Sequence, residues 1–371
     1  MESRAAFQPS RNAPAFEVRA TPMPKPSKGQ IVVRNAAVAI NPVDTYVQSH
    51  GSLMFTHLKY PFVLGYDLAG EVVQVGPGVT RFKVGDRVLA FGRGADKAIQ
   101  DPAQSAFRQH TVVFEDLATE LPAHVDYARG ATLPLAVATA AAALFDESRL
   151  GLQLPTEPRQ PPTGKTVVIW GGSTSVGSNA IQLAIAAGYE VFTTAGSRNH
   201  ETMRRLGAAG VWDHKSGTAA GEIAAALNEQ GKTLAGVVSI GFGAAEQCIR
   251  IVDRVRRGNK FIAMATYPTP EKIPQSFALL RVGVPYVSAL LSYRIRGAMR
   301  GFKSALVVVD PILSNGLARR IFRDFLPKAL EAGSYVPTPE PEVVGHGLEY
   351  IQPAFEKLRK GVSAKKIVVT L

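Results

Sequence analysis

The stretch VVIWGGSTSVGSNAIQLAIAAG, residues 167–188, constrains the fold of this 371-residue chain more than any other. An apolar run enters a glycine-rich turn, and an amphipathic helix follows. Such a turn brings backbone N–H groups and the positive end of the helix dipole close to a pyrophosphate. Gly172 and Gly177 fit the dinucleotide-binding pattern, but Thr174 replaces its middle glycine, so a purely structural turn remains an alternative.

Apolar runs of about five residues alternate with helical stretches over the second part of the chain. This alternation is typical of a parallel sheet covered by helices on both faces. We therefore predict a doubly wound nucleotide-binding domain. Its predicted strands are TVVIW (166–170), EVFTT (190–194), GVWDH (210–214), GVVSI (236–240) and KFIAMA (260–265).

The first part of the chain has a different pattern. Short runs such as AGEVVQVG alternate apolar and polar residues between turn sequences such as GPGV and KVGD, which predicts a β-rich domain. The closing helix and strand, within GHGLEYIQPAFEKLRKGVSAKKIVVTL, are expected to return to that domain. The predicted fold class is α/β, with a β-rich domain at 1–130 completed by about 335–371, and a nucleotide-binding domain at 131–334.

Composition excludes several classes of protein. The single cysteine, Cys248, rules out an internal disulfide, and no apolar run approaches the roughly 18 residues of a membrane span. We expect a cytoplasmic protein without a membrane partner. The net charge of +12 favours anionic ligands, but the basic residues are spread along the chain, unlike those of a nucleic-acid binder.

One basic segment stands out, residues 280–303. It is interpreted as a solvated helix face, with a landing surface for a phosphate-bearing carrier as the alternative. Its basic residues are Arg281, Arg294, Arg296, Arg300 and Lys303.

The end of the second predicted strand indicates which nucleotide is bound. Enzymes that use NAD usually carry an acidic residue there, whereas this chain has Ser197, Arg198 and Asn199. A hydroxyl and a guanidinium can bind a 2'-phosphate that a carboxylate would repel. The predicted cofactor is therefore NADPH. Alternatively, Ser197 serves only to cap the next helix.

Four segments resemble the medium-chain dehydrogenase/reductase superfamily: AINPVDTY, YPFVLGYDLAGEVVQVGPGVTRFKVGDRVLAF, GGSTSVG and GVSAKKIVV. The likeness covers nearly the whole chain and is closest to the zinc-free quinone-reductase and enoyl-reductase branch, which includes fungal trans-acting enoyl reductases of polyketide pathways. It implies a GroES-like β domain built from both chain ends, a Rossmann domain, and an active site in the cleft between them.

The resemblance also bears on metal binding. Zinc-dependent relatives place a cysteine and a histidine where this chain has Asn41 and Tyr66, and neither residue is a competent zinc ligand. Four cysteines for a structural zinc are also lacking. Asp44 and Asp67 could bind a metal in principle, but lone carboxylates are more often solvated or hydrogen-bonded. We expect no metal.

Without a Lewis acid, oxidation of an alcohol loses the group that stabilises an alkoxide. Reduction of a polarised C=C bond, in an enone or enoyl thioester, does not require a Lewis acid, because hydrogen-bond donors can stabilise the enolate. An NADPH-dependent reductase of such bonds, plausible in secondary metabolism, is the predicted function. The alternatives are a quinone oxidoreductase, a trans-acting enoyl reductase that receives substrate from a phosphopantetheine carrier, and a nucleotide-binding interaction protein without catalysis. A homodimer is compatible with all of these.

The proton donor is the least defined part of the predicted site. The resemblance aligns Leu53 with a tyrosine of the mitochondrial-type enoyl thioester reductases. Tyr46 is preferred, because it follows NPVD where trans-acting enoyl reductases often have a lysine that faces the cofactor; Asn41 is the second predicted catalytic residue. Water is an equally reasonable donor. The other nearby donors are His50, His57, Tyr60 and Tyr66.

Cofactor contacts are predicted from the turn, from the strand ends and from the resemblance, which implies that Thr139 touches the nicotinamide. Ligands of parallel sheets lie at the carboxyl ends of the strands. The predicted contacts are Asp44, Thr139, Gly172, Ser173, Thr174, Ser175, Val176, Gly177, Ser197, Arg198, Asn199, His214, Gly241, Met264, Ala265 and Val362.

Overall fold

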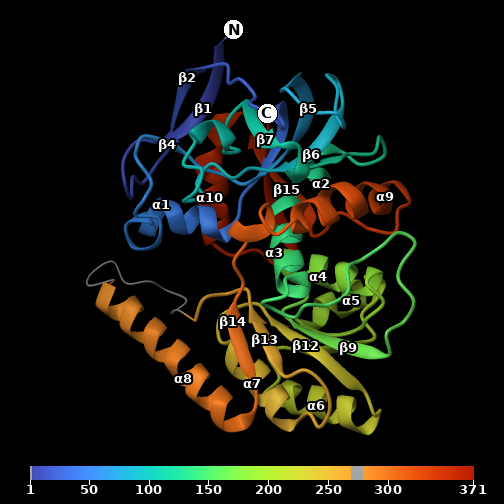
Figure 1. Cartoon of the computed structure of the whole chain (residues 1–371). Helices are drawn as coiled ribbons and strands as arrows, with labels where there is room; N and C mark the ends of the chain where they lie inside the picture. The colour runs from blue at the N-terminus through green and yellow to red at the C-terminus, as the bar shows by residue number, and fades with distance from the viewer. Residues whose placement is uncertain (1, 269–278) are drawn as a thin grey trace. The chain divides into compact units, whose positions relative to one another are not determined.

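A computed structural model describes residues 2–268 and 279–371 of the chain. The chain divides into two compact units (Figure 1). Unit 1 contains Met1–Ala136 and Ala318–Leu371, and unit 2 contains Val137–Leu317.

Unit 1 is built on two sheets of mostly antiparallel strands. The larger sheet has the order β15-β16-β3-β5-β6-β8, and β7 also pairs with β3. Its strands are β3 (Gln30–Ala39), β5 (Asp67–Val75), β6 (Arg87–Phe91), β7 (His110–Phe114), β8 (Ala118–Glu120), β15 (Glu340–His346) and β16 (Lys365–Thr370). The smaller sheet, of order β2-β1-β4, contains β1 (Glu2–Gln8), β2 (Glu17–Pro22) and β4 (Phe62–Val63).

The last strand of the chain joins the first strands of the larger sheet, as the sequence predicted. β16 pairs with β3 in an antiparallel register that places Val368 opposite Ala39. Ile367, Val368 and Val369 are fully buried, as is most of β3. Burial of this apolar run ties the two chain ends of unit 1 into one core.

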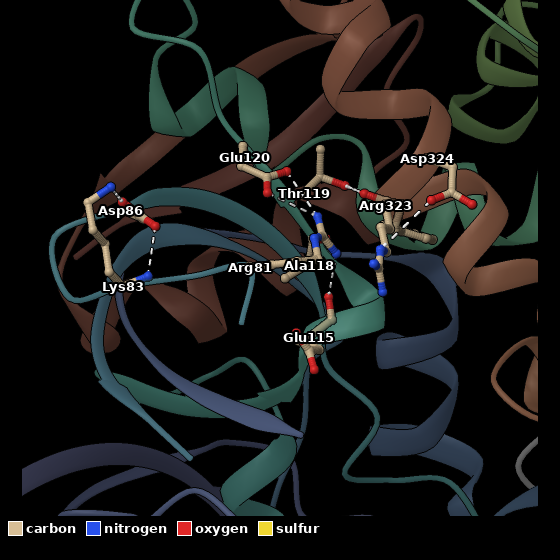
Figure 2. Close-up of polar contacts among 10 residues, drawn as sticks. Arg81, Lys83, Asp86, Glu115, Ala118, Thr119, Glu120, Arg323 and Asp324 are labelled. Carbon is tan, nitrogen blue, oxygen red and sulfur yellow. Dashed lines mark hydrogen bonds and ion pairs between the residues drawn. The ribbon is translucent and has the colours of Figure 1, made fainter. Parts of the chain in front are cut away.

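Arg81 connects the loop after β5 to the β7–β8 region (Figure 2). Its guanidinium donates to the carbonyl oxygen of Glu115 at 3.0 Å and to the carboxylate of Glu120 at 2.9 Å. Next to this contact, the Thr119 hydroxyl donates to the carbonyl oxygen of Phe322 at 2.6 Å. The hydrogen bond from Thr119 attaches the returning π-helical segment η6 (Arg319–Phe325) to β8.

Unit 2 contains a six-stranded sheet in which all neighbouring strands are parallel, in the order β11-β10-β9-β12-β13-β14. The strands are β9 (Lys165–Trp170), β10 (Glu190–Ala195), β11 (Gly210–Asp213), β12 (Thr233–Ser239), β13 (Phe261–Met264) and β14 (Lys303–Leu306). The first five were predicted. The sixth, KSAL, was missed because it is a short edge strand without an apolar run.

Helices complete the two units (Figure 1). Unit 1 has α1 (Pro42–Met54), α2 (Tyr127–Gly130), α9 (Leu326–Glu331) and α10 (Ile351–Arg359). Most of α3 (Pro134–Phe145) belongs to unit 2, with α4 (Ser175–Ala186), α5 (His200–Arg205), α6 (Ala219–Glu229), α7 (Ala244–Arg254) and α8 (Val284–Arg300).

The helical stretch Tyr127–Phe145 is long and apolar enough to cross a membrane by length and composition. However, 78% of its most apolar window is buried inside the protein. Ala136, Val137 and Ala138 are almost completely buried, which is the burial expected of a core helix.

Candidate functional site

The glycine-rich turn of unit 2 lies between β9 and α4, in the context that the sequence predicted. The Thr174 hydroxyl caps α4 by accepting from the backbone N–H of Gly177 at 3.0 Å, and it donates to the carbonyl oxygen of Gly171 at 2.8 Å. A Cβ on Gly177 would collide with that same carbonyl oxygen. Thr174, at the position where the dinucleotide-binding pattern has its middle glycine, therefore stabilises the turn through its side chain.

The geometry of this turn fits a pyrophosphate. Ser173, Thr174, Ser175 and Val176 are all partly exposed, so their backbone is accessible. The first N–H groups of a helix have no acceptor within the helix, and the helix dipole adds positive potential at the same point. α4 has no acidic residue in its first turn to compete for these groups.

The segment after β10 forms a compact, exposed turn. Ser197 and Arg198 are exposed, and the His200 ring binds the carbonyl oxygen of Ala195 at 3.0 Å. The alternative that Ser197 caps the next helix is wrong, because Ser197 begins a short 3-10 turn and Asn199 occupies the cap position of α5. The Ser197 and Arg198 side chains therefore remain accessible to a ligand.

Unit 2 brings His214 to the same turn. Parallel pairing of β10 and β11 sets Ala195 beside Asp213, and the His214 ring lies 3.7 Å from the position of a Cβ on Gly196. Asp213 is the acidic residue at this edge of the sheet. Its backbone contact with Lys215 lowers its pKa, so its carboxylate is ionised at neutral pH. The carboxylate accepts from the Lys215 backbone N–H at 2.9 Å.

The carboxyl ends of β12 and β13 are joined by a direct contact. Gly241, with φ of +110°, donates its N–H to the Thr266 hydroxyl at 2.8 Å, and a Cβ there would meet open space. Ala265 donates its backbone N–H to Ser239 at 2.9 Å. The side chain of Met264 packs in the core of unit 2 and is only 2% exposed. Gly241 and Ala265 thus lie together, whereas Met264 can offer a ligand only its backbone.

A buried polar network in unit 1 surrounds Asn41. Its side-chain nitrogen donates to Asp67 Oδ2 at 2.8 Å, and its side-chain oxygen accepts from the Lys366 ammonium. Lys366 also pairs with Asp67 at 2.9 Å, while the other Asp67 oxygen accepts from the Leu135 backbone at 2.6 Å. Asn41, Asp67 and Lys366 are each at most 4% exposed. The network therefore balances its buried charges internally.

Asp44 lies beside this network and closes a capping box at the start of α1. Its Oδ2 accepts from the Asn41 backbone N–H at 2.7 Å, whereas its Oδ1 is buried without a hydrogen-bond partner among the described residues. Burial raises the pKa of Asp44 to about 8, and the Asp67 charge adds to the increase, against the opposing effects of Asn41 and Lys366. Asp44 is therefore protonated at neutral pH, and a cofactor contact through it stays a prediction.

Tyr46 lies two residues after Asp44 on α1 and is only partly buried. Its ring is tilted against that of His50, with centroids 5.9 Å apart. Burial lowers the pKa of His50, and the nearby Arg359 lowers it further, so His50 is neutral at pH 7. Leu53, also partly buried, carries no proton to give.

The remaining predicted proton donors serve packing. His57 binds the carbonyl oxygen of Ala95 at 2.9 Å. The Tyr60 hydroxyl is buried, and Tyr66 is 6% exposed and stacked on Phe91. Tyr46 and His50 are both partly exposed, and the assignment of Tyr46 as proton donor stays a prediction.

Two predicted cofactor contacts lie outside these groups. Thr139 is partly exposed on α3, a helix whose other side chains are mostly buried. Val362 is partly exposed in the loop before β16. The structure places both residues where part of the side chain is accessible.

The donor set around Asn41 does not fit zinc. Both ends of the Asn41 amide are used within the network, and the Lys366 ammonium already supplies a positive charge there. A divalent cation at this point would be repelled by that charge. Over residues 2–268 and 279–371, no three His, Cys, Asp or Glu side chains gather as a metal site would require.

Comparisons with known proteins agree with this architecture. The alcohol dehydrogenase GroES-like domain family matches residues 27–123. Dehydrogenase pigH from Monascus ruber is 52% identical over 369 residues, covering 100% of this chain and 99% of that protein. Trans-enoyl reductase himH from Aspergillus japonicus is 35% identical over 371 residues, covering 100% and 97%.

A solved structure extends the likeness. An alcohol dehydrogenase superfamily protein from Novosphingobium aromaticivorans superposes with a TM-score of 0.75 at 25% identity, and the match covers 100% of this chain and 99% of that one. The fold and the relatives define an oxidoreductase with a GroES-like unit and a Rossmann-like unit. The chain belongs to the medium-chain dehydrogenase/reductase superfamily, as its sequence predicted.

The raised pKa of Asp44 predicts a pH dependence of stability. A carboxyl whose pKa is higher in the folded state than in the unfolded chain stabilises the fold below about pH 4, and this contribution is lost as the pH rises toward 8. We expect the wild-type free energy of unfolding to fall by up to about 1.4 kcal/mol per pH unit between pH 5 and 8 from this group. Asp44→Asn, which keeps the shape without the titration, should flatten the slope. Urea titrations at pH 5, 6, 7 and 8 measure it, and equal slopes for both proteins would contradict the assignment.

Proposed function

We propose that the protein is an NADPH-dependent, zinc-independent reductase of activated C=C bonds, in an enone or enoyl thioester. The observation that carries this proposal is the Lys366–Asn41–Asp67 network. It surrounds Asn41, the residue that the resemblance sets in place of the first zinc ligand, with an internal ion pair. A substrate whose carbonyl needs only hydrogen-bond donors suits such a site better than an alcohol does.

The name of one relative supports the same reaction class. Trans-enoyl reductase himH matches this chain over its whole length. A shared fold does not by itself establish a shared substrate, so the chemistry of the site has to carry the proposal. We also propose, from the resemblance alone, that the protein is a cytoplasmic enzyme of secondary metabolism.

In this proposal, different residues of unit 2 bind different parts of the cofactor. The turn at Gly172–Gly177 binds the pyrophosphate, and Arg198, with His214 beside the same turn, binds the 2'-phosphate. Backbone groups at Gly241 and Ala265 lie toward the nicotinamide, at the carboxyl ends of β12 and β13. When bound, NADPH supplies a hydride to the β-carbon of the substrate.

Tyr46 is proposed to complete the reduction by donating a proton or by orienting the enolate oxygen. The Lys366–Asn41–Asp67 network fixes the first turn of α1, because its member Asn41 forms the capping box of that helix with Asp44. A fixed first turn sets the backbone position of Tyr46, and general acid catalysis needs the donor to be well positioned.

A quinone is the second substrate class to test. Its carbonyl oxygens require hydride and proton delivery of the same kind, so the network around Asn41 does not distinguish it from an enone. Delivery of the substrate by a phosphopantetheine carrier is also compatible with the basic residues of α8, of which Arg294 is exposed.

Purified protein with NADPH and a panel of enones, enoyl thioesters and quinones tests the proposed function. We expect the enones or enoyl thioesters to be reduced fastest, with turnover unchanged after treatment with a chelator. Turnover of alcohols alone, or loss of turnover on chelation that zinc restores, would contradict the proposal.

Replacement of Arg198 tests the cofactor preference. Arg198→Ala should weaken NADPH binding about tenfold to a hundredfold, because a hydrogen bond to a charged group contributes roughly 1.5–3 kcal/mol. NADH binding should hardly change. Arg204→Ala, which removes an equal charge from an exposed position on α5, is the matched control. Titrations in which Arg198→Ala weakens both cofactors equally would refute the contact.

Replacement of Tyr46 tests the proton transfer. Tyr46→Phe keeps the ring and should lower turnover about 100-fold if the hydroxyl takes part in chemistry, with NADPH affinity nearly unchanged. Tyr350→Phe, at an exposed site 43% accessible in unit 1, is the control. Wild-type turnover of the Tyr46 variant would eliminate this hydroxyl and favour water as the donor.

A further inference from the structure

Two aromatic side chains are exposed just past the carboxyl ends of the neighbouring strands β12 and β13 of unit 2 (Figure 1). Phe242 follows β12 and is 49% exposed, and Tyr267 follows β13 and is 40% exposed. A single exposed apolar side chain is common on a protein surface and needs no explanation. The position of these two matters more, because ligands of parallel sheets bind at the carboxyl ends of the strands.

The backbone around Phe242 forms a tight turn. Phe242 lies between Gly241 and Gly243, whose φ angles are +110° and +71°. Residues other than glycine rarely adopt such angles, and α7 begins directly after Gly243. The turn therefore sets the point at which the Phe242 side chain leaves the backbone.

This turn is in contact with the glycine-rich turn after β9. Ile240 donates its N–H to the carbonyl oxygen of Trp170 at 3.0 Å, and a Cβ on Gly171 would lie 2.6 Å from the carbonyl oxygen of Ile240. The next residue, Gly241, donates its N–H to the Thr266 hydroxyl at 2.8 Å. A chain of contacts thus leads from the turn proposed to bind the pyrophosphate to the ends of β12 and β13. Each exposed ring comes one position after this last hydrogen bond.

A second aromatic ring packs against Tyr267. The ring of Tyr286, in the first turn of α8, lies with its centroid 6.2 Å from that of Tyr267, at an interplanar angle of 52°. Burial raises the pKa of Tyr267, and Tyr286 and Asp310 raise it further. The Tyr267 hydroxyl is therefore un-ionised at neutral pH, and the two rings form an uncharged aromatic surface.

We propose that Phe242 and Tyr267 determine substrate specificity by contacting a flat, conjugated group, an aromatic ring or a polyene, attached to the double bond that is reduced. This inference rests on the proposed function and names the substrate class of that reaction. Hydride transfer requires the double bond to lie against the nicotinamide, which is proposed to lie at Gly241 and Ala265. The part of the substrate next to the double bond then lies within reach of both rings.

A conjugated group suits this surface better than a saturated acyl chain does. Contacts between aromatic rings contribute to binding beyond the apolar area that they bury, whereas a saturated chain gains only from that area. A flat group also loses less conformational freedom on binding than a flexible chain of the same size. The two rings should therefore discriminate between substrates that carry the same reacting group.

Two methyl ketones with the same number of carbon atoms test the proposal. Benzylideneacetone carries a phenyl ring on the reacting double bond, and 3-decen-2-one carries a saturated chain. Phe242→Leu and Tyr267→Leu keep an apolar side chain but remove the ring. Each should raise the KM for benzylideneacetone about threefold to tenfold and hardly change the KM for 3-decen-2-one, with kcat little changed for both.

Three controls accompany these variants. Tyr267→Phe keeps the ring and should retain the preference for benzylideneacetone, which separates the effect of the ring from that of the hydroxyl. Tyr350→Leu removes an exposed ring from unit 1 and should change neither KM. Unchanged circular dichroism would show that each variant folds.

Two results would overturn the proposal. If both leucine variants weaken NADPH binding and affect the two ketones alike, the rings contact the cofactor and not the substrate. If neither leucine variant changes the ratio of the two KM values, the rings do not contact the substrate at all. In both cases the proposed reaction would stand, because wild type would still reduce the enones.

Failure of the proposed function gives a different result, in which wild type reduces neither ketone. Saturation-transfer NMR with benzylideneacetone and NADP⁺ then tests the contact without turnover. Transfer to the phenyl protons that is present in wild type and lost in both leucine variants would support the contact with a conjugated ligand. Equal transfer in all three proteins, or none in wild type, would overturn it.

Discussion

The pairing of Lys366 with Asp67 is the contact on which the interior of unit 1 depends. Both side chains are almost fully buried, and the loss of one partner of such a pair typically costs about 3–5 kcal/mol, because the other charge is left unpaired. The pair connects β16 to β5 and, through Asn41, to the start of α1. The start of the helix that carries Tyr46 is therefore held by a buried ion pair and its hydrogen bonds.

The same network illustrates how far the sequence alone can predict a site. The sequence identifies Asn41 as a replaced ligand, because the surrounding AINPVDTY segment has a recognisable pattern. It does not reveal Lys366, which lies 325 positions further along the chain and meets Asn41 only after β16 pairs with β3. A signal was present nonetheless, since a lysine in the apolar strand KKIVVT requires a buried acidic partner.

The fold of unit 2 was easier to predict than its details. Apolar runs identified β9 to β13, including the four-residue edge strand β11, whereas β14, with the sequence KSAL, contains no such run. Helix capping was less predictable. Thr174 was read as a departure from the glycine pattern, but its hydroxyl holds the turn together, and Ser197 was a plausible cap that the backbone does not use.

The position of β16 has a consequence for the order in which the chain can fold during synthesis. β16 lies inside the larger sheet between β15 and β3, so unit 1 lacks an internal strand until residues 365–370 have left the ribosome. Unit 2 is formed by one continuous segment, Val137–Leu317, and can fold as soon as that segment emerges. During this interval the last residues of β3, Ala37–Ala39, present an unpaired, apolar strand edge, which is the kind of surface that chaperones protect from aggregation.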